Sequence, residues 1–276
     1  MHASDGTELV LHDLGGLGDD LLVTHGAGLC ATMLAPMARA LAGDYHTVGL
    51  DLRGHGASSR PSSRDYTWAR IGKDVREVLL SAPRSMRVFG HSLGGSAALL
   101  AALERPDAIR SLCLFEPIIL GAEDEAEIEE IAQQIERRRA VFESRAEIAE
   151  HFSRRGVFAT LDQRALAGYV VGGFHRQADG TFALALTPED EAAVFRESTA
   201  LGVWDGLDIL PELDLEITVL YGSTSTGSRA AGAERLEKLD RRVRVVEVEG
   251  VGHFGPFEAP ELVGQMVSAT FRGSPA

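Results

Sequence analysis

The amino-acid sequence predicts an α/β fold, in which a mostly parallel sheet is covered by helices on both faces and carries a helical lid insertion. The first observation is that apolar, strand-like runs alternate with helical segments along residues 1–120 and 206–276. This alternation is typical of a parallel sheet. The second observation is that residues 121–205 break the alternation with a series of helices. Removing them leaves a continuous α/β series, so we expect a core in two parts, 1–120 and 206–276, with a lid at 121–205.

Length and composition set limits on the kind of protein. The 276 residues are enough for one large domain with an insertion or for two small domains, and 45% hydrophobic with 25% charged residues is ordinary for a globular chain. The net charge of −14 argues against nucleic acid or an anionic membrane as a partner. No apolar run approaches the roughly 18 residues of a membrane span. The expected partner is a small-molecule substrate, and the sequence gives no indication of oligomeric state.

The compartment is predicted from the first residues and the cysteines. The start at Met1 lacks a basic segment followed by an apolar core, so we see no signal peptide. Cys30 and Cys113 lie in apolar surroundings, which is typical of reduced, buried packing residues. We therefore expect a cytoplasmic protein.

The expected strands are short apolar runs, and most lead into glycine or a polar residue. They span residues 7–14, 21–24, 45–50, 87–89, 109–115, 217–222 and 243–248. The expected core helices span residues 32–41, 68–80, 96–103, 230–239 and 260–271. Within 121–205 we expect one helix marked by Ile128, Ile131, Ile135 and Phe142, and two more at 146–152 and 163–171.

One stretch carries the strongest chemical signal, the pentapeptide Gly90-His91-Ser92-Leu93-Gly94 between an apolar strand and an alanine-rich helix. A G-x-S-x-G turn lifts its serine out of the strand and places it at the positive end of the next helix, with a strained backbone. A Cβ at either glycine would collide across so tight a turn. The simpler interpretation is a strand-to-helix loop in which the serine only caps the helix. We interpret the turn as a nucleophile elbow with Ser92 at its apex.

Three further glycine-rich loops follow predicted strands. They are His25-Gly26-Ala27-Gly28, Asp51-Leu52-Arg53-Gly54-His55-Gly56 and Gly252-His253-Phe254. Each alone is a weak signal. Together with the elbow, and in this order, they resemble the α/β-hydrolase superfamily, in its serine-nucleophile, lid-containing type. The resemblance covers the whole chain except residues 121–205, whose sequence is not diagnostic.

The resemblance implies roles for several of these residues. Ser92 would be the nucleophile, His253 the general base, and the backbone N–H groups of Ala27 and Leu93 the oxyanion hole. It assigns His25, His91 and the loop at 51–56 to structure.

The acid of the triad departs from the family pattern. Its usual place is an aspartate shortly after the strand that follows the lid, but residues 223–228 contain no carboxylate. Glu116 ends the strand after the elbow helix, where certain haloalkane dehalogenases of this superfamily carry their acid, so we predict Glu116. The alternatives are that His253 acts unassisted or that the Ser225 hydroxyl assists it. Glu258 is assigned to the start of the last helix, and Asp205 to the return of the lid.

These features predict a serine hydrolase that acts on an ester, lactone or related acyl bond through a Ser-His-Glu triad. No cofactor or metal is expected, and a serine at the elbow argues against epoxide and haloalkane chemistry, which needs a carboxylate nucleophile. The apolar lid residues Val157, Phe158, Phe174, Phe182 and Trp204 indicate a small to medium apolar substrate. The missing aspartate leaves two alternatives open: a non-hydrolytic lyase, cyclase or acyltransferase, and a ligand-binding protein with a decayed triad.

Overall fold

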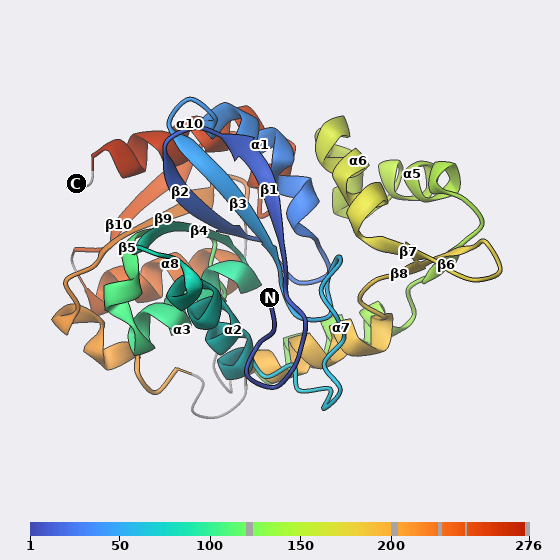
Figure 1. Ribbon diagram of the computed structural model, residues 1–276, viewed down its shortest axis with the longest axis horizontal. Helices are drawn as coiled ribbons and strands as arrows, with labels where there is room; N and C mark the ends of the chain where they lie inside the picture. The colour runs from blue at the N-terminus through green and yellow to red at the C-terminus, as the bar shows by residue number, and fades with distance from the viewer. Residues whose placement is uncertain (120–123, 200–203, 226–227, 241, 274–276) are drawn as a thin grey trace.

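A computed structural model describes residues 1–119, 124–199, 204–225, 228–240 and 242–273. The start of the expected lid, at 121–123, and its residues 200–203 lie outside this part. Figure 1 shows a central sheet with helices on both faces and a further group of helices and short strands beside it. Within the described residues, no helix is long and apolar enough to cross a membrane.

The central sheet has seven strands in the order β1-β3-β2-β4-β5-β9-β10, and all pairs are parallel except β1 with β3. The strands are β1 (Val10–Gly16), β2 (Asp19–Thr24), β3 (Tyr45–Asp51), β4 (Met86–His91), β5 (Ile109–Phe115), β9 (Glu216–Gly222) and β10 (Arg244–Val248). Each expected strand is present. Because β2 to β10 are parallel, their carboxyl ends meet at one edge of the sheet.

The first strand starts and ends later than predicted. Gly15 and Gly16, which lie beyond the expected strand at 7–14, belong to β1, which has an irregular register between Asp13 and Gly15. Both glycines have positive φ, a conformation that glycine adopts at little cost. The irregularity extends the pairing with β3 into the glycine-rich stretch.

Helices cover both faces of the sheet, as predicted (Figure 1). One face carries α2 (Trp68–Ser81), α3 (Leu93–Glu104) and α8 (Ser228–Leu239), and the other carries α1 (Ala35–Leu41) and α10 (Pro260–Arg272). The apolar face of α2 is buried as expected through Ile71, Val75, Val78 and Leu79. The alanine-rich α3 is buried on nearly all sides, which explains why it contains no charged residue before its last turn.

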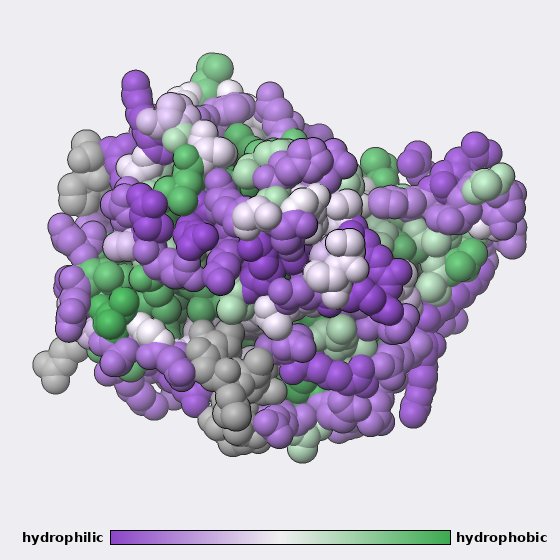
Figure 2. Space-filling model, turned by 60° about the horizontal axis from the view of Figure 1, so that its bottom comes forward, coloured by the Kyte–Doolittle hydropathy of each residue, from purple (hydrophilic) through white to green (hydrophobic). Residues whose placement is uncertain are grey.

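The segment between β5 and β9 contains the predicted helices but is not purely helical. Its helices are α4 (Glu125–Glu136), α5 (Arg145–Ser153), α6 (Gln163–Gly172) and α7 (Pro188–Arg196), with 3₁₀ helices at Gly156–Thr160, Glu197–Thr199 and Leu207–Glu212. Three short strands, β6 (Val141–Phe142), β8 (Phe182–Leu184) and β7 (Phe174–Arg176), form a second, antiparallel sheet. Figure 2 shows a mostly hydrophilic surface from which part of this segment projects.

Two expectations for this segment are therefore wrong. Phe142, which we placed on the first helix, lies in β6, six residues beyond Glu136, where α4 ends. The prediction of helices alone missed the hairpin of β7 and β8, whose connection contains Asp179-Gly180 with Gly180 at φ +92°. Asp-Gly is typical of a hairpin turn. The flanking strands have only three residues each, which is too few to show the alternation that identifies a strand.

Candidate active site

Ser92 occupies the sharp turn between β4 and α3. Its backbone has φ +53° and ψ −123°, outside the regions that non-glycine residues normally adopt. A Cβ at Gly90 would lie 2.5 Å from Gly95 Cα, and one at Gly94 would lie 2.6 Å from the His25 carbonyl oxygen. Both glycines are therefore required by the tight approach of backbone to backbone. The turn sets the Ser92 side chain at the carboxyl edge of the sheet, at the amino end of a helix.

His253 lies between Ser92 and Glu116, although 161 and 137 residues separate it from them in the chain. His253, in the loop between β10 and α9 (Gly255–Glu258), has its Nε2 atom 3.1 Å from Ser92 Oγ. Its Nδ1 atom lies 2.6 Å from Glu116 Oε2. Because an ionised carboxylate only accepts hydrogen bonds, Nδ1 carries the proton and Nε2 presents its lone pair to the serine.

Glu116 is held rigidly at the end of β5. It is fully buried, its φ is +44°, and its backbone N–H donates to the Leu220 carbonyl. Its other carboxylate oxygen accepts the Gly222 N–H at 2.8 Å. Burial acts to raise the pKa of Glu116, but the hydrogen bond from His253 and the charge it can carry outweigh burial and leave the pKa lowered. The site therefore contains an ionised acid.

Ser225, at the position where the family pattern places an aspartate, lies beside this carboxylate. Its hydroxyl contributes to the lowered pKa of Glu116, but it is buried and its geometry falls short of a hydrogen bond. Glu258 and Asp205, the other acids that we weighed, lie elsewhere. Glu258 ends the short helix α9, not the last helix, and accepts the Gly252 N–H at 2.8 Å, which fixes the loop that carries His253.

The loop at residues 25–28 faces Ser92 across the site. Ala27 and Leu93 line the same cavity as Ser92 and His253. Leu93 begins α3, so its N–H is one of the amides that have no partner within the helix. A hydrogen bond within the turn stabilises the loop, since Leu29 N–H donates to the Gly26 carbonyl at 3.2 Å.

Buried histidines fasten this loop to its neighbours. His25 Nε2 accepts the Leu52 N–H at 3.2 Å, and His55 Nε2 accepts the Gly28 N–H at 3.1 Å. Burial and the nearby His25 lower the pKa of His55 to about 3, so this histidine stays neutral and remains an acceptor. His91 Nε2 lies 2.8 Å from the His253 carbonyl oxygen. The histidine bond to Gly28 was not foreseen, because nothing in the spacing of the motifs indicates which loops touch.

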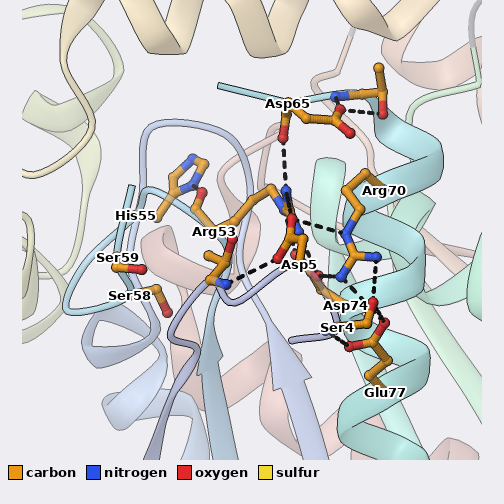
Figure 3. A network of polar contacts seen from close by, with 12 residues as sticks. Ser4, Asp5, Arg53, His55, Ser58, Ser59, Asp65, Arg70, Asp74 and Glu77 are labelled. Carbon is orange, nitrogen blue, oxygen red and sulfur yellow. Dashed lines mark hydrogen bonds and ion pairs between the residues drawn. The ribbon is translucent and has the colours of Figure 1, made fainter. Parts of the chain in front are cut away.

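The loop at residues 51–56 is anchored by an ionic network, shown in Figure 3. Arg53 is fully buried and binds both carboxylate oxygens of Asp74, at 2.5 and 2.7 Å. It also binds Asp5 at 3.0 Å and the Asp65 carbonyl at 2.9 Å. The His55 ring in turn binds the Arg53 carbonyl at 2.9 Å, so the network supports the loop at 25–28 through His55.

A cavity of about 110 Å³ opens beside Ser92. Apolar side chains from the core and from the segment between β5 and β9 line much of it, namely Leu29, Trp68, Ile118, Ile128, Ile131, Val194 and Phe195. The five lid residues that we expected to indicate the substrate are not among the described lining residues. Phe158 and Phe174 pack in the aromatic cluster around Phe152 and Tyr169, whereas Val157 is exposed. Trp204 packs edge-on against Trp68, and Phe182 packs against the same apolar cluster as Phe152 and Tyr169.

A model of the alpha/beta hydrolase family matches residues 21–265, which is most of the chain. This chain is an α/β-hydrolase. The match includes both parts of the sheet and the segment between β5 and β9.

Relatives of this α/β-hydrolase differ in their sequence identity to it and in the share of the chain that the match covers. It is 25% identical to 2-(acetamidomethylene)succinate hydrolase of Mesorhizobium japonicum over 256 residues, which cover 90% of this chain and 86% of that protein. It is 34% identical to fluoroacetate dehalogenase of Burkholderia sp over 110 residues, or 38% of this chain and 36% of that protein. The chain thus covers little more than a third of the dehalogenase. A crystal structure of E-2-(acetamidomethylene)succinate hydrolase superposes with a TM-score of 0.83 at 20% identity, over 99% of this chain and 98% of the other. At that identity the superposition shows a shared fold.

Proposed function

We propose that this α/β-hydrolase is a serine hydrolase that cleaves an ester, lactone or related acyl bond through Ser92, His253 and Glu116. The observation that carries the proposal is the continuous chain of contacts from Ser92 Oγ to His253 Nε2, at 3.1 Å, and from His253 Nδ1 to Glu116 Oε2, at 2.6 Å. These are the distances that a general base and its orienting acid need. Relatives that are named as hydrolases favour the same reaction class.

The proposed reaction follows from the proton positions. Ser92 Oγ attacks the acyl carbon while its proton passes to His253 Nε2, and the ionised Glu116 stabilises the charge that the imidazole gains. The N–H groups of Ala27 and Leu93 hold the developing oxyanion. His253 then returns the proton to the leaving oxygen, which departs and leaves an acyl-enzyme. Water, deprotonated by His253, releases the carboxylate and restores Ser92.

We also propose that the segment at residues 121–205 is a lid that completes the substrate cavity. Ile128 and Ile131 of α4 and Val194 and Phe195 of α7 contribute apolar walls, opposite Ser92 and His253 of the core. Such walls fit a small to medium substrate with an apolar body.

Intact mass after exposure to a fluorophosphonate tests the proposal, with Ser92→Ala as the control. We expect one adduct on the native protein and none on the variant. A folded native protein that gains no adduct would contradict an activated Ser92 and favour a ligand-binding role. Turnover in ¹⁸O-labelled water separates hydrolysis from lyase or acyltransferase chemistry, because only hydrolysis places the label in the product carboxylate.

A further inference from the structure

The cavity beside Ser92 contains a hydroxyl that the proposed reaction does not use. Ser198 lies in the 3₁₀ helix Glu197–Thr199, directly after α7, and lines the cavity. Its side chain is almost completely buried, with 1% of the residue exposed. Within the described part of the chain, its Oγ atom has no hydrogen-bond partner.

The usual local acceptor for this hydroxyl already binds a different donor. A serine in or near a helix commonly donates to the carbonyl four residues back, which here is that of Val194. That carbonyl already accepts the indole N–H of Trp68 at 2.8 Å. A buried hydroxyl without a partner destabilises the protein, because it has lost its hydrogen bonds to water. A polar group that enters the cavity would recover that free energy.

The charge around the cavity limits what this group can be. Among the described lining residues there is one carboxylate, that of Glu127, and there is no lysine or arginine. An anionic group would leave water for a mostly apolar wall in which the described lining residues offer no lysine or arginine to pair with it. An uncharged oxygen has a much smaller cost of desolvation and can accept from, or donate to, Ser198.

We propose that Ser198 makes the cavity selective for substrates that carry an uncharged hydrogen-bonding group, such as an ether, ketone or hydroxyl oxygen, away from the bond that Ser92 attacks. This inference rests on the proposed function and narrows its substrate class. A purely hydrocarbon substrate would leave the Ser198 hydroxyl unpaired in the complex. A site built to bond an oxygen discriminates against the analogue that lacks it.

An oxygen scan tests this selectivity. The first series consists of p-nitrophenyl hexanoate and its analogues in which an ether oxygen replaces one CH₂ of the acyl chain. The second series consists of hexyl acetate and its analogues in which an ether oxygen replaces one CH₂ of the hexyl group. The ratio of kcat/KM between each ether and its hydrocarbon parent is measured for the native protein and for Ser198→Ala. Intrinsic ester reactivity cancels between the two proteins.

Ser111→Ala is the matched control. Ser111 is also 1% exposed, and its hydroxyl also lacks a partner within the described residues, but it lies on β5 and is not among the described lining residues. We expect Ser198→Ala to lower the ratio by about 3- to 10-fold for at least one oxygen position, as for the loss of one neutral hydrogen bond. We expect Ser111→Ala to leave every ratio unchanged. The mono-p-nitrophenyl ester of adipic acid, whose chain ends in a carboxylate, should be a poorer substrate than any ether.

The outcomes separate the two proposals. Ester turnover and a Ser92 adduct, with the same ratios in Ser198→Ala and Ser111→Ala, would overturn the role of Ser198 and leave the hydrolase intact. A preference for the adipate ester would overturn the exclusion of anions. If no ester is cleaved and no adduct forms, the proposed function fails and the selectivity fails with it. The melting temperature of Ser198→Ala should equal or exceed that of the native protein, since the change removes an unpaired buried hydroxyl.

Discussion

At the scale of single residues, the proposed triad acid Glu116 reaches His253 from a different strand than the one that carries the aspartate in the family pattern. Its positive φ turns the chain immediately after β5, and its longer side chain reaches His253 while it accepts the Gly222 N–H from the end of β9. The carboxylate thus lies between the end of β5 and the start of the loop that holds Ser225. On the proposed mechanism, that loop needs no carboxylate, because Glu116 at the end of the neighbouring strand supplies the acid.

Glu116→Gln is expected to lower kcat by about 10²- to 10⁴-fold. The amide is uncharged and can donate to Nδ1, which favours the tautomer that points a proton, rather than a lone pair, at Ser92. Steady-state kinetics at neutral pH, with circular dichroism to verify folding, measures the effect. Glu258→Gln is the control, since its carboxylate binds the Gly252 N–H in the same region, and it should retain most of the activity. Near-native turnover by Glu116→Gln would place the acid elsewhere.

That Ser92, His253 and Glu116 lie together could be predicted, because each follows a recognisable strand at the same edge of the sheet. Ser198 could not, since it lies in a Glu-Ser-Thr sequence after a helix that we did not predict. No local pattern indicates that the Val194 carbonyl is occupied by a tryptophan 126 residues away. Whether a polar atom is left unpaired depends on contacts that only the folded chain establishes.

At the scale of elements, an ion pair joins the edge strand β1 to Asp51, the last residue of β3. His12 Nε2 lies 2.7 Å from Asp51 Oδ2, at the end of β3. The two oxygens of Asp51 also accept the N–H groups of Ala31 and Ala57, at 2.7 and 2.8 Å. The hydrogen bond to Asp51 is the main cause that raises the pKa of His12 above its ordinary value of 6.5, although burial opposes it. The protonated histidine therefore stabilises the fold.

This raised pKa predicts a pH dependence. A group whose pKa is higher in the folded state contributes its full stabilisation below the unfolded value of 6.5 and loses it as the pH rises through the folded value. The difference in free energy of unfolding between the native protein and His12→Gln should therefore be largest below pH 6.5 and shrink at higher pH. Urea denaturation at several pH values measures it. Effects of histidines remote from Asp51 cancel in the difference, and His25, whose Nε2 lies 3.8 Å from Asp51 Oδ1, is kept neutral by burial, which lowers its pKa. A difference that is constant with pH would contradict the assigned ion pair.

The strands and helices of the core were predictable because their apolar periodicity reflects burial on a sheet. The second sheet was not, since β6, β7 and β8 have only two or three residues each and show no period. The residues that line the cavity could not be predicted either. The sequence marked the largest aromatic residues as candidates, whereas α4 and α7 cover the site with isoleucine, valine and a single phenylalanine.

At the scale of the whole molecule, a buried ion pair connects two helices of the proposed lid to the loop opposite Ser92. Arg138, which follows α4, binds both carboxylate oxygens of Glu191 in α7. Burial raises the pKa of Glu191, and the charge of Arg138 opposes this. Glu191 packs against Gly28, where an added Cβ would lie 2.4 Å from its Oε1 atom. The pair therefore supports the position of the loop at 25–28 from the lid side.

Arg138→Met should reduce the free energy of unfolding by about 3 kcal/mol, because it leaves the Glu191 carboxylate buried without a partner. The double variant Arg138→Met/Glu191→Leu should recover much of the loss. The adjacent Arg139→Met is the control: its partner is the more exposed Glu147, so a change below about 1 kcal/mol is expected. Urea denaturation measures all three. Equal losses for the two single variants would show that Glu191 does not depend on Arg138.

The long separation between the members of the proposed triad has a consequence for the chain as it is synthesised. Ser92 and Glu116 leave the ribosome early, but the strand that holds the Glu116 carboxylate begins at residue 216 and His253 comes 161 residues after Ser92. Until that last histidine has folded into place, the nucleophile has no base, and an incomplete chain carries an ordinary serine. On the proposed mechanism, the chain is therefore expected to attack acyl groups only after residue 253 has been synthesised and folded against Ser92.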